Sequence, residues 1–461
     1  MKQQRYIAII DIGKTNAKVA LVDMDCLKEL RVCTTPNHVV AGPPYAHYDT
    51  HALWQFICAS LKTFHAEFGV DAISVSAHGA TLAMVDEHGG LAGPIMDYEF
   101  SGFDDTWQAY QAHRPPFEES GSPLLPGGLN SAAQLYWIQQ NCPKIWQRTK
   151  RIVTYPQYWS GHLSGVFVNE VTSLGSHSDL WNPHKSDFSS IVERLGFADK
   201  MAPVKPANTL LGNVRPEMAE ACGLPNDVAV YCGIHDSNAS LYPYLLLQRA
   251  SFNVVSTGTW VISMAIGSTS PTLDPARDTL VNVNAFGDRV PSARFMGGRE
   301  FSLMVPEGAQ SPDSQILNQV LASKDFIRPQ VFENAGPYMG QTSNWQEIVE
   351  GKSSTEIYAL ASLYLALVSA ECLTMIGLQK EIIVEGPFAK NDIYLEMLGI
   401  ATGKDILVNS SSDTGTTIGA ALLVGRSLKE NEFQCKMAHT PHLPAMKTAF
   451  EAYRDNWKRD V

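Results

Sequence analysis

A short polar segment that follows the first apolar run of the chain has residue types suited to holding a phosphate and a metal ion. It spans residues 11–18 and reads Asp-Ile-Gly-Lys-Thr-Asn-Ala-Lys. Gly13 permits a tight turn whose backbone N–H groups can point outward toward phosphate oxygens. Asp11 closes an apolar strand, where a carboxylate is costly unless it meets a cation, and hydrated Mg²⁺ uses one or two carboxylates. The segment predicts Asp11 as a metal ligand beside a bound phosphate, although an ordinary hairpin has the same pattern.

Two later segments repeat this arrangement of an apolar run followed by a polar turn. Residues 256–260 offer the hydroxyl groups of Thr257 and Thr259, and Gly258 lets the backbone approach a phosphate closely. Residues 385–391 separate an apolar run from a helical pattern. They are either an ordinary loop or a nucleotide site outside the carboxyl end of a strand. Each segment is weak alone, but two facing turns can hold a polyphosphate between two lobes.

The elements that position these segments follow one order twice. In the first half, strands are predicted at 6–10, 17–22, 27–34 and 72–77, with a helix at 53–68 whose apolar residues recur every three or four positions. In the second half, the predicted elements are strands at 251–255, 260–266, 381–384 and 406–408, helices at 356–376 and 392–401, and a last helix from about 414. This alternation predicts an α/β protein of two domains, 1–245 and 246–461, with an irregular insertion at about 98–225.

Bulk composition excludes several classes of protein. The chain has 461 residues, 45% hydrophobic and 18% charged, and a formal net charge of −12, so we expect a globular protein and no nucleic-acid partner. We also expect no leader peptide and no membrane span. The eight cysteines form no C-x-x-C pair and no zinc spacing, which favours a cytoplasmic protein with reduced thiols.

Taken together, the polar segments resemble the FGGY family of carbohydrate kinases, within the actin, hexokinase and Hsp70 ATPase superfamily. The family's first phosphate loop is matched by Asp11, Gly13, Thr15 and Lys18, with Lys14 in place of the usual first threonine. Its motif G-x-x-D, which carries the catalytic aspartate, is matched by residues 233–236, and its second phosphate motif by residues 256–259. Its closing small-residue helix is matched by residues 413–422, so the resemblance covers essentially the whole chain. It implies two actin-like (ribonuclease H-like) lobes with a cleft between them.

The resemblance also implies the residues of a nucleotide site and a catalytic base. The predicted ligands of MgATP are Gly13, Lys14, Thr15, Asn16, Lys18, Thr257, Gly258, Thr259, Gly386 and Asn391. The adenosine motif is matched only in part, by Gly386 and Asn391. Asp236 is the predicted base, because phosphoryl transfer needs a group that orients the acceptor hydroxyl and takes its proton. An alternative role for Asp236 is to cap the helix that follows it.

The sugar site is predicted in the N-terminal lobe. His78 and Gly79 follow a strand at the position of a substrate contact in related kinases, and Tyr98 and Glu99 lie where relatives carry an aromatic residue and often N/D-x-R. This chain has no arginine there, which points to an unusual substrate. The remaining predicted sugar ligands are His177, Asp179, His235 and Asp236. The role of residues 297–301, Gly-Gly-Arg-Glu-Phe, stays open between a nucleotide contact, a contact with the other lobe and a simple turn.

The leading interpretation is a kinase that transfers the γ-phosphate of ATP to a hydroxyl of a ketose or alditol, for example a ketopentose or a deoxyketohexose. One alternative is an actin-like or Hsp70-like ATPase module without a sugar substrate. Another is a sugar-binding protein that has lost catalysis, against which the presence of Asp11 and Asp236 speaks. A homodimer is compatible with the sequence, which does not fix the oligomeric state.

Overall fold

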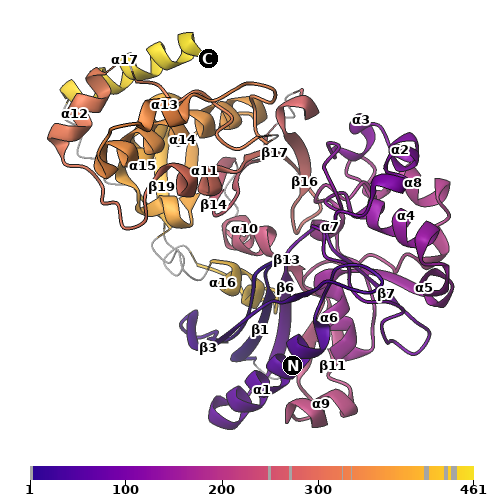
Figure 1. Ribbon diagram of the computed structural model, residues 1–461. Helices are drawn as coiled ribbons and strands as arrows, with labels where there is room; N and C mark the ends of the chain where they lie inside the picture. The colour runs from indigo at the N-terminus through magenta and orange to yellow at the C-terminus, as the bar shows by residue number, and fades with distance from the viewer. Residues whose placement is uncertain are drawn as a thin grey trace. The chain divides into compact units, whose positions relative to one another are not determined.

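The computed structural model describes residues 4–247, 251–268, 272–323, 325–333, 335–409, 415–429, 435–437 and 444–461 (Figure 1). The chain forms two compact units. Unit 1 consists of Met1–Gln248, Val281–Arg289 and Thr414–Phe433, and unit 2 of Arg249–Leu280, Val290–Asp413 and Gln434–Val461. Two segments from the second half of the chain therefore belong to unit 1. A single division at 245/246 does not describe this arrangement.

Unit 1 is built on a sheet with the strand order β11-β12-β6-β1-β2-β3, in which β13 also pairs with β6. The strands are β1 (Tyr6–Ile12), β2 (Asn16–Asp23), β3 (Lys28–Pro36), β6 (Ala72–Ala77), β11 (Leu210–Asn213), β12 (Ala229–Tyr231) and β13 (Ile234–His235). β1, β2 and β3 form an antiparallel meander, whereas β6 runs parallel to β1, and β12 and β13 run parallel to β6. The strands predicted in this half are confirmed.

Helices cover both faces of the central strands of unit 1, because alternate side chains of β1 and β2 are buried on opposite sides. Helices α1 (Thr50–Phe68) and α6 (Tyr155–Ser164) cover one face, and α10 (Asp236–Leu246) and α16 (Gly415–Leu422) the other. Asp49 caps α1 by accepting a hydrogen bond from the backbone N–H of Ala52 at 2.9 Å. A side chain at Gly419 of α16 would overlap the backbone carbonyl of Ala239 in α10, so the close packing of α16 on α10 requires glycine at this position.

The prediction of an irregular insertion at 98–225 is wrong. This region contains α2 (Asp104–His113), α3 (Phe117–Ser120), α4 (Ser131–Asn141), α5 (Pro143–Arg148), α6, α7 (Val171–Leu174), α8 (Ser190–Arg194) and α9 (Pro216–Cys222), together with short strands. These helices are at most 11 residues long, too short to show a repeating apolar face in the sequence. Several of them surround a small core that includes Tyr110, Trp137 and Leu180.

Unit 2 is built on a sheet with the strand order β16-β17-β15-β14-β18-β19-β20. The strands are β14 (Phe252–Thr257), β15 (Val261–Ile266), β16 (Thr279–Val283), β17 (Arg289–Phe295), β18 (Glu381–Glu385), β19 (Asp405–Asn409) and β20 (Cys435–Met437). The division into units falls within β16, after Leu280, and again at the start of β17, after Arg289. β14, β15 and β17 are antiparallel, and β18 and β19 run parallel to β14. The order β17-β15-β14-β18-β19 repeats the order β3-β2-β1-β6-β12 of unit 1, so the predicted duplication of an α/β lobe is confirmed.

The core of unit 2 forms around α14 (Ser354–Ile376), which a capping box of Ser353 and Glu356 begins. Among the described residues, α14 is the one helix long and apolar enough to cross a membrane, but 83% of its most apolar window is buried in the protein, as in a core helix. Further helices of this unit are α11 (Gly297–Met304), α12 (Ser314–Ala322), α13 (Trp345–Val349), α15 (Asp392–Thr402) and α17 (Pro444–Asp460).

Helix α17 lies beside α12 and α15 (Figure 1) and corrects the prediction that the last helix starts near residue 414. It buries Phe450, Tyr453 and Trp457, which recur at helical spacing in a segment that is otherwise polar. That spacing was a readable signal of a helix.

Candidate active site

Asp11 and Asp236 lie at the same edge of the unit 1 sheet, where the parallel strands end. The backbone register pairs Asp11 of β1 with Ser76 of β6, and Ser76 with Ile234 of β13, two residues before Asp236. Since neighbouring strands lie about 4.8 Å apart, this pairing keeps the two carboxylates within one site. Gly233 separates β12 from β13 with a φ of +89°, and a side chain there would overlap the carbonyl oxygen of Val75. The glycine of the motif G-x-x-D thus allows the chain to stay beside β6.

Burial raises the pKa of Asp11 to about 7, because its ionised form loses hydration. The positive charge of Lys18 opposes this shift, and the negative charges of Asp236 and Glu29 add to it. The Lys18 ammonium lies 3.3 Å from the carboxylate of Glu29 and donates to the hydroxyl of Thr417 in α16. With a pKa of about 7, the Asp11 carboxyl group is only partly ionised at neutral pH. A divalent cation bound there would favour the ionised form of Asp11, so the site suits such a cation.

Asp236 is partly exposed and contacts its two neighbours in the chain. Its Oδ1 accepts hydrogen bonds from the backbone N–H and the hydroxyl of Ser237, at 2.6 and 3.3 Å, and lies 3.1 Å from Nε2 of His235. About 32% of its side chain is exposed. Helix α10 begins at Asp236, so the carboxylate also lies at a helix N-terminus, which favours negative charge. The predicted alternative that Asp236 caps the helix is wrong, because His235 occupies the N-cap position and Asp236 is the first residue of α10.

His235 is buried and orients Asp236. Burial lowers the pKa of His235, so its ring is neutral at pH 7 and can donate from Nε2 to Asp236. A side chain at Gly79 would lie too close to Nε2 of His235, so Gly79 makes room for this ring. His235 and Gly79 were predicted as sugar ligands, and their contacts connect them to Asp236.

His78 lies in an aromatic group formed by Tyr48, Tyr98 and Tyr155, with ring centroids 5.2, 5.5 and 5.0 Å from its own. Burial lowers its pKa to about 4, which makes the ring neutral at pH 7. Its Nδ1 lies 2.9 Å from the carbonyl oxygen of Gly79. The charge of Asp236 acts on the pKa of both His78 and Tyr98, which brings these predicted sugar ligands into the neighbourhood of the predicted base.

Lys14 lies with this group, although its position in the turn predicted a phosphate contact. Its ammonium pairs with the carboxylate of Asp97 and lies 3.1 Å from that of Glu99. It also lies 4.9 Å from the ring centroid of Tyr98. Asp97 is buried and was not singled out from the sequence, because a lone aspartate before a tyrosine carries no recognisable pattern.

The β1–β2 turn differs from its prediction in one further respect. The N–H of Gly13 donates to the carbonyl of Asn16 at 2.9 Å, so it closes the turn and does not point outward. Thr15 and Asn16 are exposed, and the Asn16 amide donates to the Thr15 hydroxyl at 3.2 Å. The side chain of Asn37 holds the turn from behind by donating to the carbonyl of Gly13 at 2.8 Å.

Asp179 and His177 have structural partners. The buried carboxylate of Asp179 accepts hydrogen bonds from Arg114, at 2.6 and 2.9 Å, and from the hydroxyl of Tyr110 at 2.5 Å. Nδ1 of His177 lies 2.9 Å from the carbonyl of Leu129. These contacts fix the loop after α7 to α2 and α4, and they account for Asp179 without a ligand.

In unit 2, the predicted phosphate segment, residues 256–259, is hydrogen-bonded to the predicted adenosine segment, residues 385–391. The hydroxyl of Thr257 donates to the carbonyl of Glu385 at 2.5 Å and accepts from the N–H of Phe388 at 3.1 Å. Gly386 has a φ of +82° and would overlap the carbonyl of Thr257 if it carried a side chain. Thr257, predicted to bind phosphate, is thus buried in the connection between the two segments.

A pocket of about 410 Å³ opens beside this connection, entirely within unit 2. It is lined by Gly258, Thr259, Gly298, Arg299, Phe301, Ser302, Tyr358, Pro387, Phe388, Lys390 and Asn391. Gly298 packs so closely on the carbonyl of Gly258 that no side chain fits. Residues 297–301 begin α11, and Gly298, Arg299 and Phe301 line this pocket. The nucleotide contact offered for this segment stays a prediction.

The wall of this pocket includes three aromatic rings, of which Tyr358 lies outside the segments that the sequence singled out. Phe301 lies 5.4 Å from Tyr358 and 5.5 Å from Phe388, between ring centroids. Asn391 caps α15 through the N–H of Tyr394 at 3.1 Å and donates to Ser362 at 2.8 Å, so its side chain is already occupied. Tyr358 lies within a long helix pattern, where the sequence offers no signal that distinguishes a pocket residue from a core residue.

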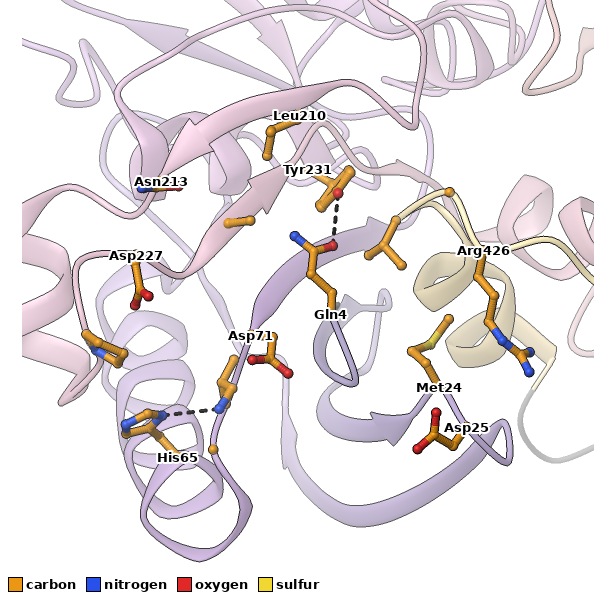
Figure 2. Close-up of a pocket in the computed structure, with 16 residues that line it drawn as sticks. Gln4, Met24, Asp25, His65, Asp71, Leu210, Asn213, Asp227, Tyr231 and Arg426 are labelled. Carbon is orange, nitrogen blue, oxygen red and sulfur yellow. Dashed lines mark hydrogen bonds between the residues drawn. The ribbon is translucent and has the colours of Figure 1, made fainter. Parts of the chain in front are cut away.

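A larger pocket of unit 1, about 580 Å³, lies at the other edge of the sheet (Figure 2). Its lining includes Gln4 and Asp71, which precede β1 and β6, whereas Asp11 and Asp236 follow the far ends of β1 and β13. Gln4 accepts from the hydroxyl of Tyr231 at 2.9 Å, and Asp71 accepts from the N–H of Tyr6 at 3.0 Å. These polar groups hold strand starts together, so this pocket is separate from the candidate active site.

Comparisons with known proteins agree with this geometry. Residues 6–242 match the model of the FGGY family of carbohydrate kinases, N-terminal domain, and residues 249–432 match that of carbohydrate kinase FGGY, C-terminal domain. A carbohydrate kinase from Novosphingobium aromaticivorans has 33% sequence identity and a TM-score of 0.88 over 100% of this chain and 99% of its own.

Curated relatives carry sugar kinase names. The probable L-xylulose kinase of Pasteurella multocida (strain Pm70) is 25% identical over 485 residues, which cover 97% of this chain and 96% of the relative. An L-fuculokinase of Salmonella typhi is 26% identical over 270 residues, so the match spans 57% of this chain and 57% of that relative.

Proposed function

Because this chain belongs to the FGGY family of carbohydrate kinases and is an ATP-dependent sugar kinase, we propose that it phosphorylates a hydroxyl group of a small ketose or alditol, with Asp236 as the base. The observation that carries the assignment of the base is the placement of Asp236 beside Asp11 at the carboxyl edge of the unit 1 sheet. The relatives named L-fuculokinase and probable L-xylulose kinase support a ketose as the acceptor.

Unit 1 would bind the sugar and activate its hydroxyl. Oδ1 of Asp236 is held by His235 and Ser237, so Oδ2 would accept the hydrogen bond of the reacting hydroxyl. The hydroxyl oxygen attacks the γ-phosphorus of ATP, the bond from that phosphorus to the β–γ bridging oxygen breaks, and the hydroxyl proton passes to Asp236. ADP and the sugar phosphate are the products.

Unit 2 would bind the adenosine end of ATP in the 410 Å³ pocket. The ring of Tyr358 or Phe388 can pack on a purine, and the lack of a side chain at Gly258 leaves room for the ribose and phosphates. Thr259 and Arg299 would supply polar contacts to phosphate oxygens. Thr257, Gly386 and Asn391 would act by shaping this pocket, since their polar groups are already bonded within unit 2.

Magnesium fits the residues of unit 1 as a hydrated ion. Among the described residues, no cluster of three or more His, Cys, Asp or Glu side chains could enclose a metal, whereas Mg²⁺ that keeps most of its waters uses one or two carboxylates. Asp11 would hold it, because the desolvation that raises the pKa of Asp11 would be relieved by a cation. When bound, the ion would neutralise charge on the transferring phosphoryl group. We also propose a cytoplasmic location, supported by the seven described cysteines, which are free thiols.

The test is ADP release by the purified protein with MgATP against a panel of ketopentoses, 6-deoxyketohexoses, alditols and aldoses. We expect one ketose or alditol to stimulate turnover at least about tenfold over the rate without sugar, as expected for an enzyme that assembles its site on the correct acceptor. Phosphorylation of the sugar is verified by mass spectrometry. Stimulation by an aldose alone, or turnover without any acceptor, would contradict the proposed substrate class.

A further inference from the structure

Lys14 is the one member of the β1–β2 turn whose charged group is turned toward the predicted sugar ligands. Its ammonium pairs with Asp97 and lies 3.1 Å from Glu99. The rings of Tyr98 and Tyr48 lie 4.9 and 5.3 Å from the same nitrogen, within the range of a cation–π contact. The Lys14 side chain is about 18% exposed, so a small ligand can still reach it.

Asp97 is positioned to present one of its two oxygens. Its Oδ1 receives the ammonium of Lys14, the hydroxyl of Tyr48 at 3.1 Å and the N–H of Glu99 at 3.2 Å. Among the described residues, every hydrogen bond to this carboxylate goes to Oδ1, which leaves Oδ2 as the acceptor for a substrate hydroxyl. The ammonium of Lys14 has three donors, of which one is taken by Asp97, and the carboxylate of Glu99 lies 3.1 Å from the same nitrogen.

The site around Lys14 adjoins the predicted base. The charge of Lys14 acts on His78, and the charge of Asp236 acts on both His78 and Tyr98. His78 and Tyr98 therefore connect the Lys14–Asp97 pair to Asp236 within unit 1. A sugar whose reacting hydroxyl meets Asp236 would extend its other hydroxyl groups along this group of side chains.

Resting on the proposed function, we propose that Lys14 and Asp97 bind a vicinal diol of the sugar and select neutral sugars over sugar acids. The ammonium of Lys14 donates to one hydroxyl oxygen, and Oδ2 of Asp97 accepts from the neighbouring hydroxyl. The two oxygens of a vicinal diol lie close enough to meet both groups at once. The carboxylates of Asp97, Glu99 and Asp236 outnumber the single ammonium, so a substrate carboxylate is repelled.

The decisive experiment measures two Michaelis constants in the variant Lys14→Met, one for the best neutral sugar and one for MgATP. Methionine keeps the length of the side chain but removes the charge and all donors. We expect the KM for the sugar to rise about 10- to 100-fold, the range for a lost hydrogen bond from a charged group, while the KM for MgATP stays within about threefold. Asp97→Asn should act in the same direction, and the double variant should lose less than the product of the two, because the residues form one unit.

Lys18→Met is the matched control, since Lys18 comes from the same turn but lies beside Asp11. It should raise the KM for MgATP or lower kcat, without the selective rise in the KM for the sugar. The inference is overturned if Lys14→Met raises the KM for MgATP instead, as its place in the turn predicts, or changes neither constant. It is also overturned if the wild type turns over an aldonate with the same number of carbon atoms as its best sugar as fast as the sugar itself.

Two further measurements separate this inference from the proposed function and from misfolding. Wild-type protein that turns over no ketose or alditol refutes both, whereas turnover with an unchanged sugar KM in Lys14→Met refutes the inference alone. Lys14→Arg keeps the charge and should restore part of the sugar affinity. If Lys14→Met is too unstable to assay, a sugar KM for Lys14→Arg and Asp97→Asn equal to that of the wild type overturns the inference.

Discussion

The β1–β2 turn of unit 1 and the β14–β15 turn of unit 2 hold the same place in two sheets with the same strand order. By strand register, the paired residues Asp11 and Lys18 of the first turn correspond to Ser256 and Ile262 of the second. Lys14, which follows Gly13, corresponds to Thr259, which follows Gly258. Both glycine N–H groups close their turns, by donating to Asn16 and to Trp260. Two turns at the same place in their sheets, which differ in length by one residue, thus carry ionisable side chains in one unit and uncharged ones in the other.

The surroundings of the two turns differ in the same sense. The unit 1 turn is bordered by carboxylates, histidines and tyrosines whose charges act on one another. The unit 2 turn is bordered by backbone in close contact, where Gly298 and Gly386 leave no room for a side chain. Ionisable groups suit proton transfer and metal binding, whereas closely packed backbone without charged side chains suits the binding of a nucleotide. Two sheets with the same strand order can therefore carry different side chains at the same turn and so support different chemical roles.

The largest expected effect comes from removing the base in unit 1. Asp236→Asn keeps the size of the side chain and an oxygen that can accept from Ser237, but the amide cannot take a proton at pH 7. We expect kcat to fall about 10²- to 10⁴-fold, the usual range for general-base catalysis, with the KM for MgATP little changed. Initial rates of ADP release, with sugar and MgATP varied separately, measure both.

Asp25→Asn is the matched control, because Asp25 is exposed near the opposite edge of the same sheet. It should leave both constants unchanged. A kcat for Asp236→Asn within about tenfold of the wild type would assign the base elsewhere and remove the chemical distinction between the two units.

An intermediate effect is expected from the backbone cradle of unit 2. In Gly386→Ala, the new methyl group overlaps the carbonyl of Thr257 at a backbone conformation that disfavours side chains. The strand–turn connection must shift, so we expect the KM for MgATP to rise about tenfold or more and stability to fall by about 1–3 kcal/mol. The KM for the sugar should stay unchanged, which is the reverse of the pattern expected for Lys14→Met.

Gly403→Ala provides the comparison for Gly386→Ala. Gly403 also has a positive φ, +65°, but nothing lies within 4 Å of the added methyl group. It should cost some stability through the backbone alone and leave both Michaelis constants unchanged. If the two variants behave alike, the close contact between Gly386 and Thr257 is unimportant for the nucleotide.

The sequence allowed the sheets to be predicted better than the sites. Apolar strands such as β6 and the long helix α14 follow from periodicity, because a buried element needs a repeating apolar pattern. The position of Asp236 follows from its motif. The partners of Lys14 could not be read in this way, because Asp97 is 83 residues away and meets Lys14 only through the fold. Tyr358 was hidden for the same reason, within the pattern of α14.

The smallest expected effect is a difference between the units in how stability depends on pH. In unit 2, Glu300 is buried, and burial raises its pKa to about 7. The unfolded chain loses this proton near pH 4.5 and the folded chain near pH 7, so the contribution of Glu300 to stability falls as pH rises through that window. In unit 1, burial lowers the pKa of His78 to about 4, so stability falls as pH drops from 6.5 toward 4.

Two neutral variants should therefore show opposite slopes. Glu300→Gln can keep the contacts with Phe332 and Tyr364, and its Tm relative to wild type should rise by about 2–6 °C between pH 5 and pH 8. The Tm of His78→Asn relative to wild type should instead rise as pH falls from 7 to 5. Because each variant is compared with itself across pH, the cost of the altered packing cancels. If the Tm differences of both variants change with pH in the same direction, burial does not shift the pKa values of Glu300 and His78 in opposite directions. The electrostatic difference between the units would then depend on Asp11, Lys14 and Asp236 alone.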